Sequence, residues 1–156
     1  MNYLGGVMKN ELLEIIKLSR LVVCSHNDNV KKVADKYNLS FAETDMLLVF
    51  SNNPNIINAK DVVNFSKVSK AYVSKSLNTL LEKKLISIQI DELDKRKQKI
   101  IINKKANNIV NDLKICEEKY LSNLTKNMKK KDIDLFIRLY QKIGSNIINR
   151  KEDIDE

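Results

Sequence analysis

Basic side chains gather in one short segment of the chain, DELDKRKQK at residues 91 to 99. Its last six residues, 94 to 99, comprise one acid, four bases and a glutamine. Clustered cations bind phosphate oxygens and other anions. The segment therefore indicates contact with a polyanion, made by Lys95, Arg96 and Lys97 at its centre.

A second candidate surface follows from the spacing in SKAYVSKSLNTLLEKK, residues 69 to 84. Val73, Leu77 and Leu81 recur at helical spacing, so this segment is predicted to be a helix with one apolar face. The other positions carry small, hydroxyl, amide and lysine side chains: Ser69, Lys70, Ala71, Tyr72, Ser74, Lys75, Asn78 and Thr79. No acid occurs among them, so this face can approach phosphates and base edges without repelling them.

The neighbouring segments position both surfaces. Residues 58 to 65 are predicted to form a short helix, and after a turn Ser69 can cap the second helix. Isoleucines at 86, 88 and 90 alternate with polar residues, as in a half-buried strand, and residues 100 to 102 are predicted to form the returning strand. Helix, turn, helix and hairpin together make a winged helix-turn-helix.

This arrangement predicts how the two surfaces meet DNA. The recognition helix 69–84 would lie in the major groove, and the wing 91–99 would lie on the minor groove beside it. Arg96 is the only arginine between residues 51 and 105. Its weakly hydrated guanidinium suits a narrow minor groove better than an ammonium does, so we predict that Arg96 enters the groove.

The rest of the chain is predicted to be helical, so the fold class is mainly α with a small β-hairpin wing. Helical spacing is expected over residues 8 to 25, and Ser40 with Glu43 is spaced as a capping box. Asn103 is expected to cap a long helix that reaches about Met128, and Asp132 to cap the last helix. The apolar positions of that helix repeat with helical spacing: Ile133, Phe136, Ile137, Tyr140, Ile143 and Ile147.

Composition places these elements in one domain of 156 residues, with a winged-helix lobe at 38–105 and helical segments at 1–37 and 106–156. Residues 51 to 105 hold twelve bases and five acids, so +7 of the net charge of +8 lies in this third. We expect no membrane span and no secretion signal. Two cysteines in no metal-type pair fit a reducing cytoplasm.

The stretch VSKAYVSKSLNTLLEKKLISIQIDELDKRKQKIIIN and the order of the elements resemble the multiple-antibiotic-resistance regulator (MarR) family of bacterial transcription factors. Its most specific part is DKRKQKIIIN, in which Asp94 and Arg96 match the wing signature. The chain differs from the family pattern at Lys67 and Lys84, where glycine is usual.

The resemblance implies a homodimer that binds a pseudo-palindromic operator in double-stranded DNA, most often as a repressor. It pairs the first and last helices of the two subunits, through Leu12, Ile16, Ile133, Phe136, Ile137, Tyr140, Ile143 and Ile147. It also implies release of DNA when a small aromatic ligand enters a cleft between the dimer helices and the lobe.

Other interpretations remain open at this point. The winged helix could bind protein or structured RNA, and Lys70 and Lys75 could be a solvated face. Tyr72 could pack instead of reaching bases, and Cys24 and Cys116 could be buried as small apolar groups. His26 is expected in a loop. We expect no enzyme, cofactor or metal, because the sequence shows no nucleophile–base pair, ligand cluster or phosphate-binding glycine loop.

Overall fold

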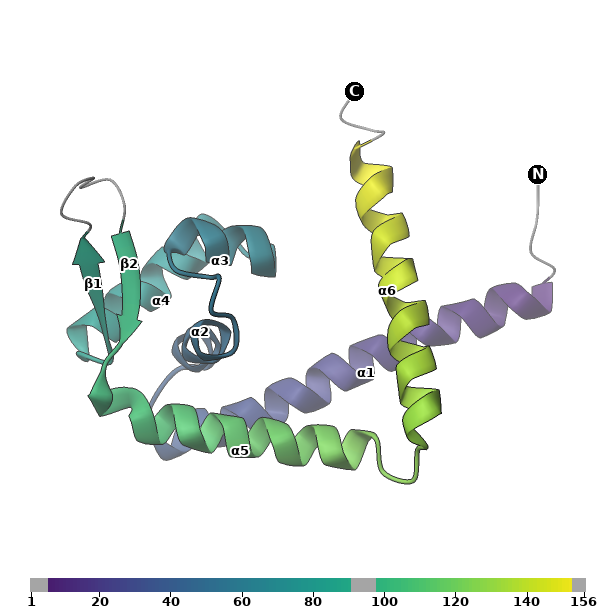
Figure 1. The fold of residues 1–156 in the computed structure, drawn as a ribbon, viewed down its shortest axis with the longest axis horizontal. Coiled ribbons are helices and arrows are strands. Elements are labelled where there is room, and N and C mark those ends of the chain that lie inside the picture. The colour runs from purple at the N-terminus through teal and green to yellow at the C-terminus, as the bar shows by residue number, and fades with distance from the viewer. Residues whose placement is uncertain (1–5, 91–97, 153–156) are drawn as a thin grey trace. The chain divides into compact units, whose positions relative to one another are not determined.

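The computed structural model describes residues 6–90 and 98–152 of the chain (Figure 1). It divides into two compact units, residues 1–120 and 121–156, and each is described by itself. The elements are α1 (Gly6–Lys36), α2 (Phe41–Asn52), α3 (Ala59–Ser66), α4 (Lys70–Glu82), β1 (Ile86–Ile90), β2 (Gln98–Ile102), the 3-10 turn η1 (Lys104–Ala106), α5 (Asn107–Leu124) and α6 (Lys130–Glu152). The predicted fold class, mainly α with a small β-hairpin wing, is confirmed.

The first unit is built around one apolar core. Its members come from the C-terminal part of α1, from α2, α3 and α4, and from the start of the hairpin and of α5: Val30, Val33, Ala34, Leu39, Met46, Leu47, Leu48, Phe50, Ile56, Val62, Val73, Leu77, Leu80, Leu85, Ile86, Ala106, Ile109 and Leu113. The winged-helix lobe therefore shares its core with α1 and α5. Burial of this apolar surface is the main term that holds the recognition helix in place.

Four polar contacts join α1, and Tyr37 just after it, to α5. Asp112 Oδ2 accepts hydrogen bonds from Lys36 Nζ at 2.6 Å and from Tyr37 Oη at 2.7 Å. Nearer the N-terminus of α1, Cys116 Sγ donates to the carbonyl of Asn29, and Tyr120 Oη donates to that of Val22 at 2.8 Å. These contacts complement the shared core, because each is directional where apolar packing is not.

Local signals located the helices of the lobe correctly. Ser40 and Glu43 form the predicted capping box, and α3 begins after Asn58, which forms a second box with Asp61. Ser69 caps α4, as predicted: its Oγ accepts a hydrogen bond from the backbone N–H of Tyr72 at 3.1 Å. Each of these caps satisfies backbone donors that the first turn of a helix leaves unpaired.

Several expectations about the helical segments are wrong. The first helix continues past residue 25 to Lys36, so His26 lies in a helix and not in a loop. Its Nε2 lies 3.8 Å from Glu117 Oε1, and its ring packs edge-on against Tyr120. Asp132 lies inside the first turn of α6 instead of preceding it. Cys24 is exposed, and Cys116 is only partly buried.

The hairpin has the predicted strands with a defined register. Ile86 pairs with Ile102, and Ile90 pairs with Gln98. The backbone N–H of Ile100 also donates to the carbonyl of Ile57 at 2.7 Å, so the segment before α3 lies along the outer edge of β2. The alternation predicts that Ile86 and Ile88 share the buried face of the strand. Ile86 is buried, but Ile88 is 43% exposed and lies outside the core, so the prediction is wrong for Ile88.

Asn103 has a role that its sequence position did not indicate. It precedes η1 but makes no side-chain capping bond, and α5 ends at Leu124 instead of near residue 128. Instead its Oδ1 accepts from Ser87 Oγ at 2.8 Å and its Nδ2 donates to the carbonyl of Lys84 at 3.1 Å. Asn103 therefore braces the base of the hairpin against the end of α4.

Candidate nucleic-acid interface

The outward face of α4 is the centre of the candidate interface. Val73, Ser76, Leu77 and Leu80 are buried and fix which side of the helix faces the core. Five of the predicted contact residues are exposed on the remaining surface: Ser69, Lys70, Ala71, Ser74 and Lys75. Asn78 is exposed beside them. The structure therefore brings together, on one accessible helix face, the cations and hydrogen-bonding groups expected to meet DNA.

Tyr72 differs from its neighbours on this helix because it is only partly exposed. Its side chain packs against the apolar core of the lobe. Burial, and after it the charge of the nearby Asp45, raise the pKa of the Tyr72 hydroxyl. Tyr72 is thus a packing residue whose hydroxyl feels the charge of Asp45 on α2.

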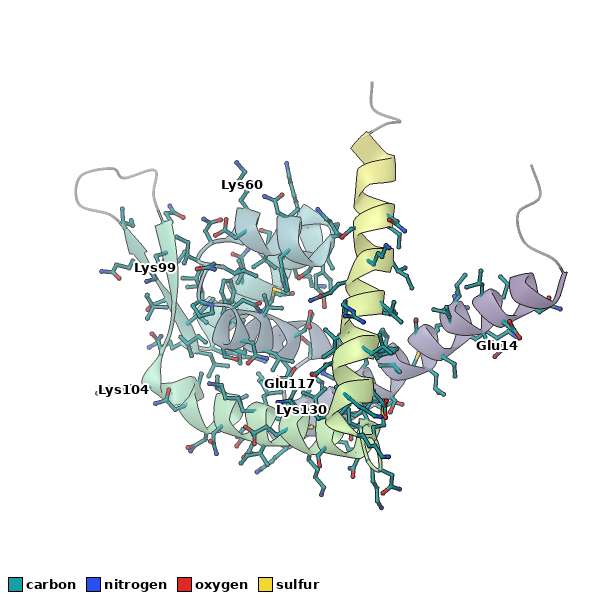
Figure 2. All side chains as sticks on the ribbon, turned by 45° about the vertical axis from the view of Figure 1, so that its right-hand side comes forward. Glu14, Lys60, Lys99, Lys104, Glu117 and Lys130 are labelled. Atoms are coloured by element: carbon teal, nitrogen blue, oxygen red, sulfur yellow. The ribbon has the colours of Figure 1, made fainter. Side chains whose placement is uncertain are left out.

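The wing supplies the second part of the interface. β1 and β2 form the base of the wing, and Lys99 is exposed on β2 (Figure 2). Asp94, Lys95, Arg96 and Lys97 lie outside the described residues. Their contacts with phosphates and with the minor groove therefore stay predictions.

A shallow groove of about 640 Å³ runs beside the recognition helix. Its apolar residues are Val63, Val73, Leu77, Leu81 and Ile88, and its other lining residues are Ala59, Lys60, Asn64, Lys70, Ser74 and Asn78. Lys60 is exposed, and its side chain projects from α3 (Figure 2). Lys60 and Asn64 are not among the contact residues predicted from the sequence, although their spacing of four on a capped helix would have placed them on one side of α3.

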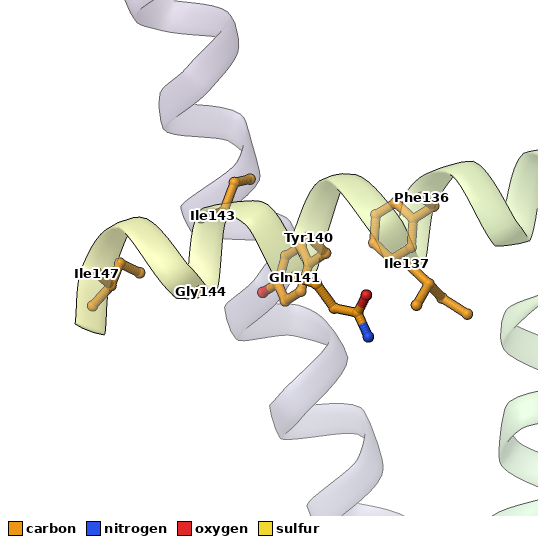
Figure 3. Close-up of a pocket in the computed structure, with 7 residues that line it drawn as sticks. All are labelled: Phe136, Ile137, Tyr140, Gln141, Ile143, Gly144 and Ile147. Atoms are coloured by element: carbon orange, nitrogen blue, oxygen red, sulfur yellow. The ribbon is translucent and has the colours of Figure 1, made fainter. Parts of the chain in front are cut away.

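Exposed apolar side chains lie on α1 and α6, outside the lobe. Leu12 and Ile16 on α1 are 44% and 65% exposed. The apolar stripe of α6 is also largely exposed; it consists of Ile133, Phe136, Ile137, Tyr140, Ile143 and Ile147. Phe136 and Tyr140 stack on each other, with ring centroids 5.5 Å apart (Figure 3). Gly144 continues this stripe, and a Cβ atom built on it would meet nothing within 4 Å. Apolar faces of this length are characteristic of surfaces that another chain covers.

Other kinds of site are absent from the part of the chain that is described. Residues 6–90 and 98–152 contain no group of three or more His, Cys, Asp or Glu that could hold a metal ion. None of the helices described there is long and apolar enough to span a bilayer.

Residues 37–97 match the MarR family model. No curated protein matches the chain. Among solved structures, a MarR protein from Peptoclostridium difficile is 22% identical, with a TM-score of 0.70 over 96% of this chain and 93% of that one. The transcription regulator MarR from Oenococcus oeni is 17% identical, with a TM-score of 0.68 over 84% of this chain and 98% of that one.

A MarR transcriptional regulator from Methanosarcina mazei is similar to the same degree, with 16% identity and a TM-score of 0.69 over 85% of this chain and 97% of that one. At these identities the structural matches show a common fold, and the family match covers the lobe that carries the interface. The capped helix α4 and the hairpin are parts of that shared winged helix-turn-helix fold, and within residues 37–97 the sequence matches the MarR family.

Proposed function

We propose that this protein is a dimeric, sequence-specific DNA-binding repressor of the cytoplasm. The observation that carries the proposal is the outward face of α4, where Lys70, Ser74 and Lys75 are exposed on a helix whose opposite face is buried. Lysine and hydroxyl groups in this arrangement can bind phosphates and base edges in a major groove. Lys95, Arg96 and Lys97 of the wing would add contacts on the minor-groove side.

Dimerisation would give the spacing that a two-fold operator requires. Two recognition helices read such an operator when they are about one turn of DNA apart. The exposed stripes of α1 and α6 are the surfaces that we assign to this contact, so residues 1–37 and 106–156 form the dimerisation region and residues 38–105 the DNA-binding lobe. An interface that holds an obligate dimer should bury more than about 2,000 Å².

Regulation by a small aromatic ligand is part of the proposal. The groove beside α4 lies within the lobe, and not between the lobe and the dimer helices as the resemblance implies. It has an apolar floor, and Lys70 and Ser74 belong both to its lining and to the exposed face of α4. An aromatic carboxylate held there would therefore compete with DNA. Addition of benzoate to the protein–DNA complex should release DNA, and no release up to millimolar benzoate would contradict this part of the proposal.

The test of DNA binding is selection of duplexes from a random pool, followed by titration of the selected duplex by fluorescence anisotropy. If a dimer neutralises about eight phosphates, log K should fall against log salt with a slope of about −7. Lys70→Gln and Lys75→Gln should each weaken binding. Lys114→Gln, on the exposed side of α5, is the matched control and should not.

Two outcomes would contradict the proposal. One is a salt slope near zero with no sequence selected from the pool. The other is tighter binding of double-stranded or hairpin RNA than of the selected DNA, which would favour an RNA-binding winged helix.

A further inference from the structure

Charged groups tie the C-terminal end of the recognition helix to α2, to the turn after α1 and to η1. Lys83 Nζ lies 2.6 Å from Glu43 Oε1 of α2 and 3.3 Å from the carbonyl of Asn38, which follows α1. In the opposite direction, Lys105 Nζ donates to the carbonyl of Lys83 at 2.8 Å. Lys83, at the end of α4, thus takes part in polar contacts with Glu43, Asn38 and Lys105.

The contact between Lys83 and Glu43 has a defined direction, because the Glu43 carboxylate is buried and hydrogen-bonded on its other side. Its side chain is 5% exposed, while that of Lys83 is 37% exposed. One carboxylate oxygen, Oε2, accepts from the backbone N–H of Ser40 at 2.6 Å. The other, Oε1, is buried and has no hydrogen-bonding partner among the described residues apart from its ion pair with Lys83. Without the ammonium group, a buried negative charge would be left uncompensated.

The ends of the two helices favour the same pairing. Glu43 lies in the first turn of α2, where the unpaired N–H groups carry partial positive charge. Lys83 is the C-cap of α4, where unpaired carbonyls carry partial negative charge. The pair therefore complements both helix ends while it joins them. Burial alone would raise the pKa of Glu43, but Lys83 and the hydrogen bonds from Ser40 lower it below its usual range.

The position of this contact matters because the base-reading residues lie at the opposite end of α4. The helix from Lys70 to Glu82 has 13 residues, so it is about 20 Å long. A tilt of about 3° about its C-terminal end would therefore move Lys70 by about 1 Å. Recognition groups must be held to within about 0.5 Å of their working geometry. The apolar core holds α4 in the lobe, and the ion pair adds a directional contact at the end of the helix far from Lys70.

We propose that Lys83 is a positioning residue for DNA recognition, which fixes the angle of α4 through its ion pair with the buried Glu43. This inference rests on the proposed DNA-binding function and assigns no DNA contact to Lys83. Lys83 thus contributes to sequence discrimination through a contact within the lobe. From the sequence alone it is one of the twelve basic residues between 51 and 105.

The experiment compares Lys83→Gln, Glu43→Gln and the double variant with wild type. The readout is the ratio of dissociation constants for a mismatched and the selected duplex. We expect this ratio to fall by about tenfold in each single variant, the equivalent of about one lost base contact, and to fall no further in the double variant. Lys83→Arg keeps the cation and should retain the wild-type ratio.

Lys36→Gln is the matched control, since Lys36 also makes a 2.6 Å ion pair, with Asp112, but this pair joins α1 to α5 and includes no residue of α4. Even if Lys36→Gln lowers the melting temperature as much as Lys83→Gln does, it should leave the ratio of dissociation constants unchanged. If Lys83→Gln does not fold, Glu43→Gln replaces it, because the amide oxygen can still accept from Ser40. An unchanged ratio in the folded variants, or an equal fall in Lys36→Gln, would overturn the proposal.

A second measurement needs no DNA. Backbone amides in the N-terminal half of α4 should exchange hydrogen at least several-fold faster in Lys83→Gln than in Lys36→Gln. If these amides exchange at equal rates in the two variants, the positioning role is overturned. This conclusion does not depend on whether the protein binds DNA with sequence preference. A wild-type protein without sequence preference would instead contradict the proposed function, so the two failures can be told apart.

Discussion

Lys67 and Lys84, one before the recognition helix and one after it, have the same left-handed backbone conformation, with φ of 54° and 57°. Lys67 ends α3, and its N–H donates to the carbonyl of Val63. After α4, Lys84 N–H donates to Leu81 O and Leu85 N–H to Leu80 O, each at 2.9 Å. This is the Schellman arrangement, in which glycine is usual. The turns that glycine would favour are therefore retained with lysine in its place.

Glycine at either position should stabilise the protein. A left-handed conformation costs a non-glycine residue roughly 1–2 kcal/mol, and the greater freedom of glycine in the unfolded chain offsets part of the gain. We expect Lys67→Gly and Lys84→Gly each to raise the free energy of unfolding by about 0.5 kcal/mol in urea titrations. Lys114→Gly, in the exposed middle of α5, should lower it by about 1 kcal/mol. A loss of stability at both left-handed positions would contradict the explanation.

Asn103 should contribute to stability as a brace. Replacing it with alanine removes the hydrogen bonds to Ser87 Oγ and to the carbonyl of Lys84. We expect Asn103→Ala to lower the free energy of unfolding by about 1–2 kcal/mol. Asn107→Ala, at the exposed start of α5, is the control, and its effect should be within about 0.5 kcal/mol of zero. Equal effects of the two would contradict the bracing role of Asn103.

Tyr72 should separate packing from recognition. Tyr72→Ala removes a ring that packs against the core, so it should lower the melting temperature. Tyr72→Phe keeps the ring and should leave stability nearly unchanged. We expect Tyr72→Phe to relax the preference at one base position per half-site in a repeated duplex selection. If its selected sequence is identical to that of wild type, Tyr72 acts by packing alone.

Two carboxyl groups of α2 should give opposite pH effects. The pKa of Glu43 is lowered in the folded protein, so its stabilisation is present above the unfolded value and is lost as the pH falls through the folded value. Burial raises the pKa of Asp45, against a smaller opposing effect of His26, so its ionised form costs stability at neutral pH.

Asp45→Asn should therefore raise the melting temperature at pH 7, and the gain should disappear at a pH below both the folded and the unfolded pKa. Asp28→Asn, which changes an exposed carboxylate of α1, is the control for the loss of one negative charge. A melting temperature lowered by Asp45→Asn at pH 7 would show that this carboxylate has a stabilising partner.

Gly144 should report on the proposed dimer. Within one subunit, nothing lies within 4 Å of a Cβ added there, so Gly144→Ala should favour the helix by about 1 kcal/mol. If the helix of a partner packs on this position, the same methyl group should weaken the dimer. We expect sedimentation equilibrium to show weaker association for Gly144→Ala than for Asn146→Ala, which lies off the stripe. Unchanged association would place the contact elsewhere.

The sequence by itself determined the elements of the lobe and their order. Ser40 and Ser69 mark helix starts because their caps involve groups only three residues away, and such local geometry can be predicted without a fold. The alternation at residues 86 to 90 likewise predicted a strand from neighbours two residues apart. The exposed face of α4 followed from helical periodicity alone.

Only the tertiary structure decided what the polar residues between these elements do. Lys83 pairs with Glu43 across forty residues, His26 meets Glu117 across a longer separation, and Asn103 bonds Ser87 across the hairpin. Such pairs cannot be predicted from residue spacing along the chain, because they depend on how the helices pack. The same reason explains Ile88: alternation predicts which side of a strand it is on, but only packing decides whether another element covers that side.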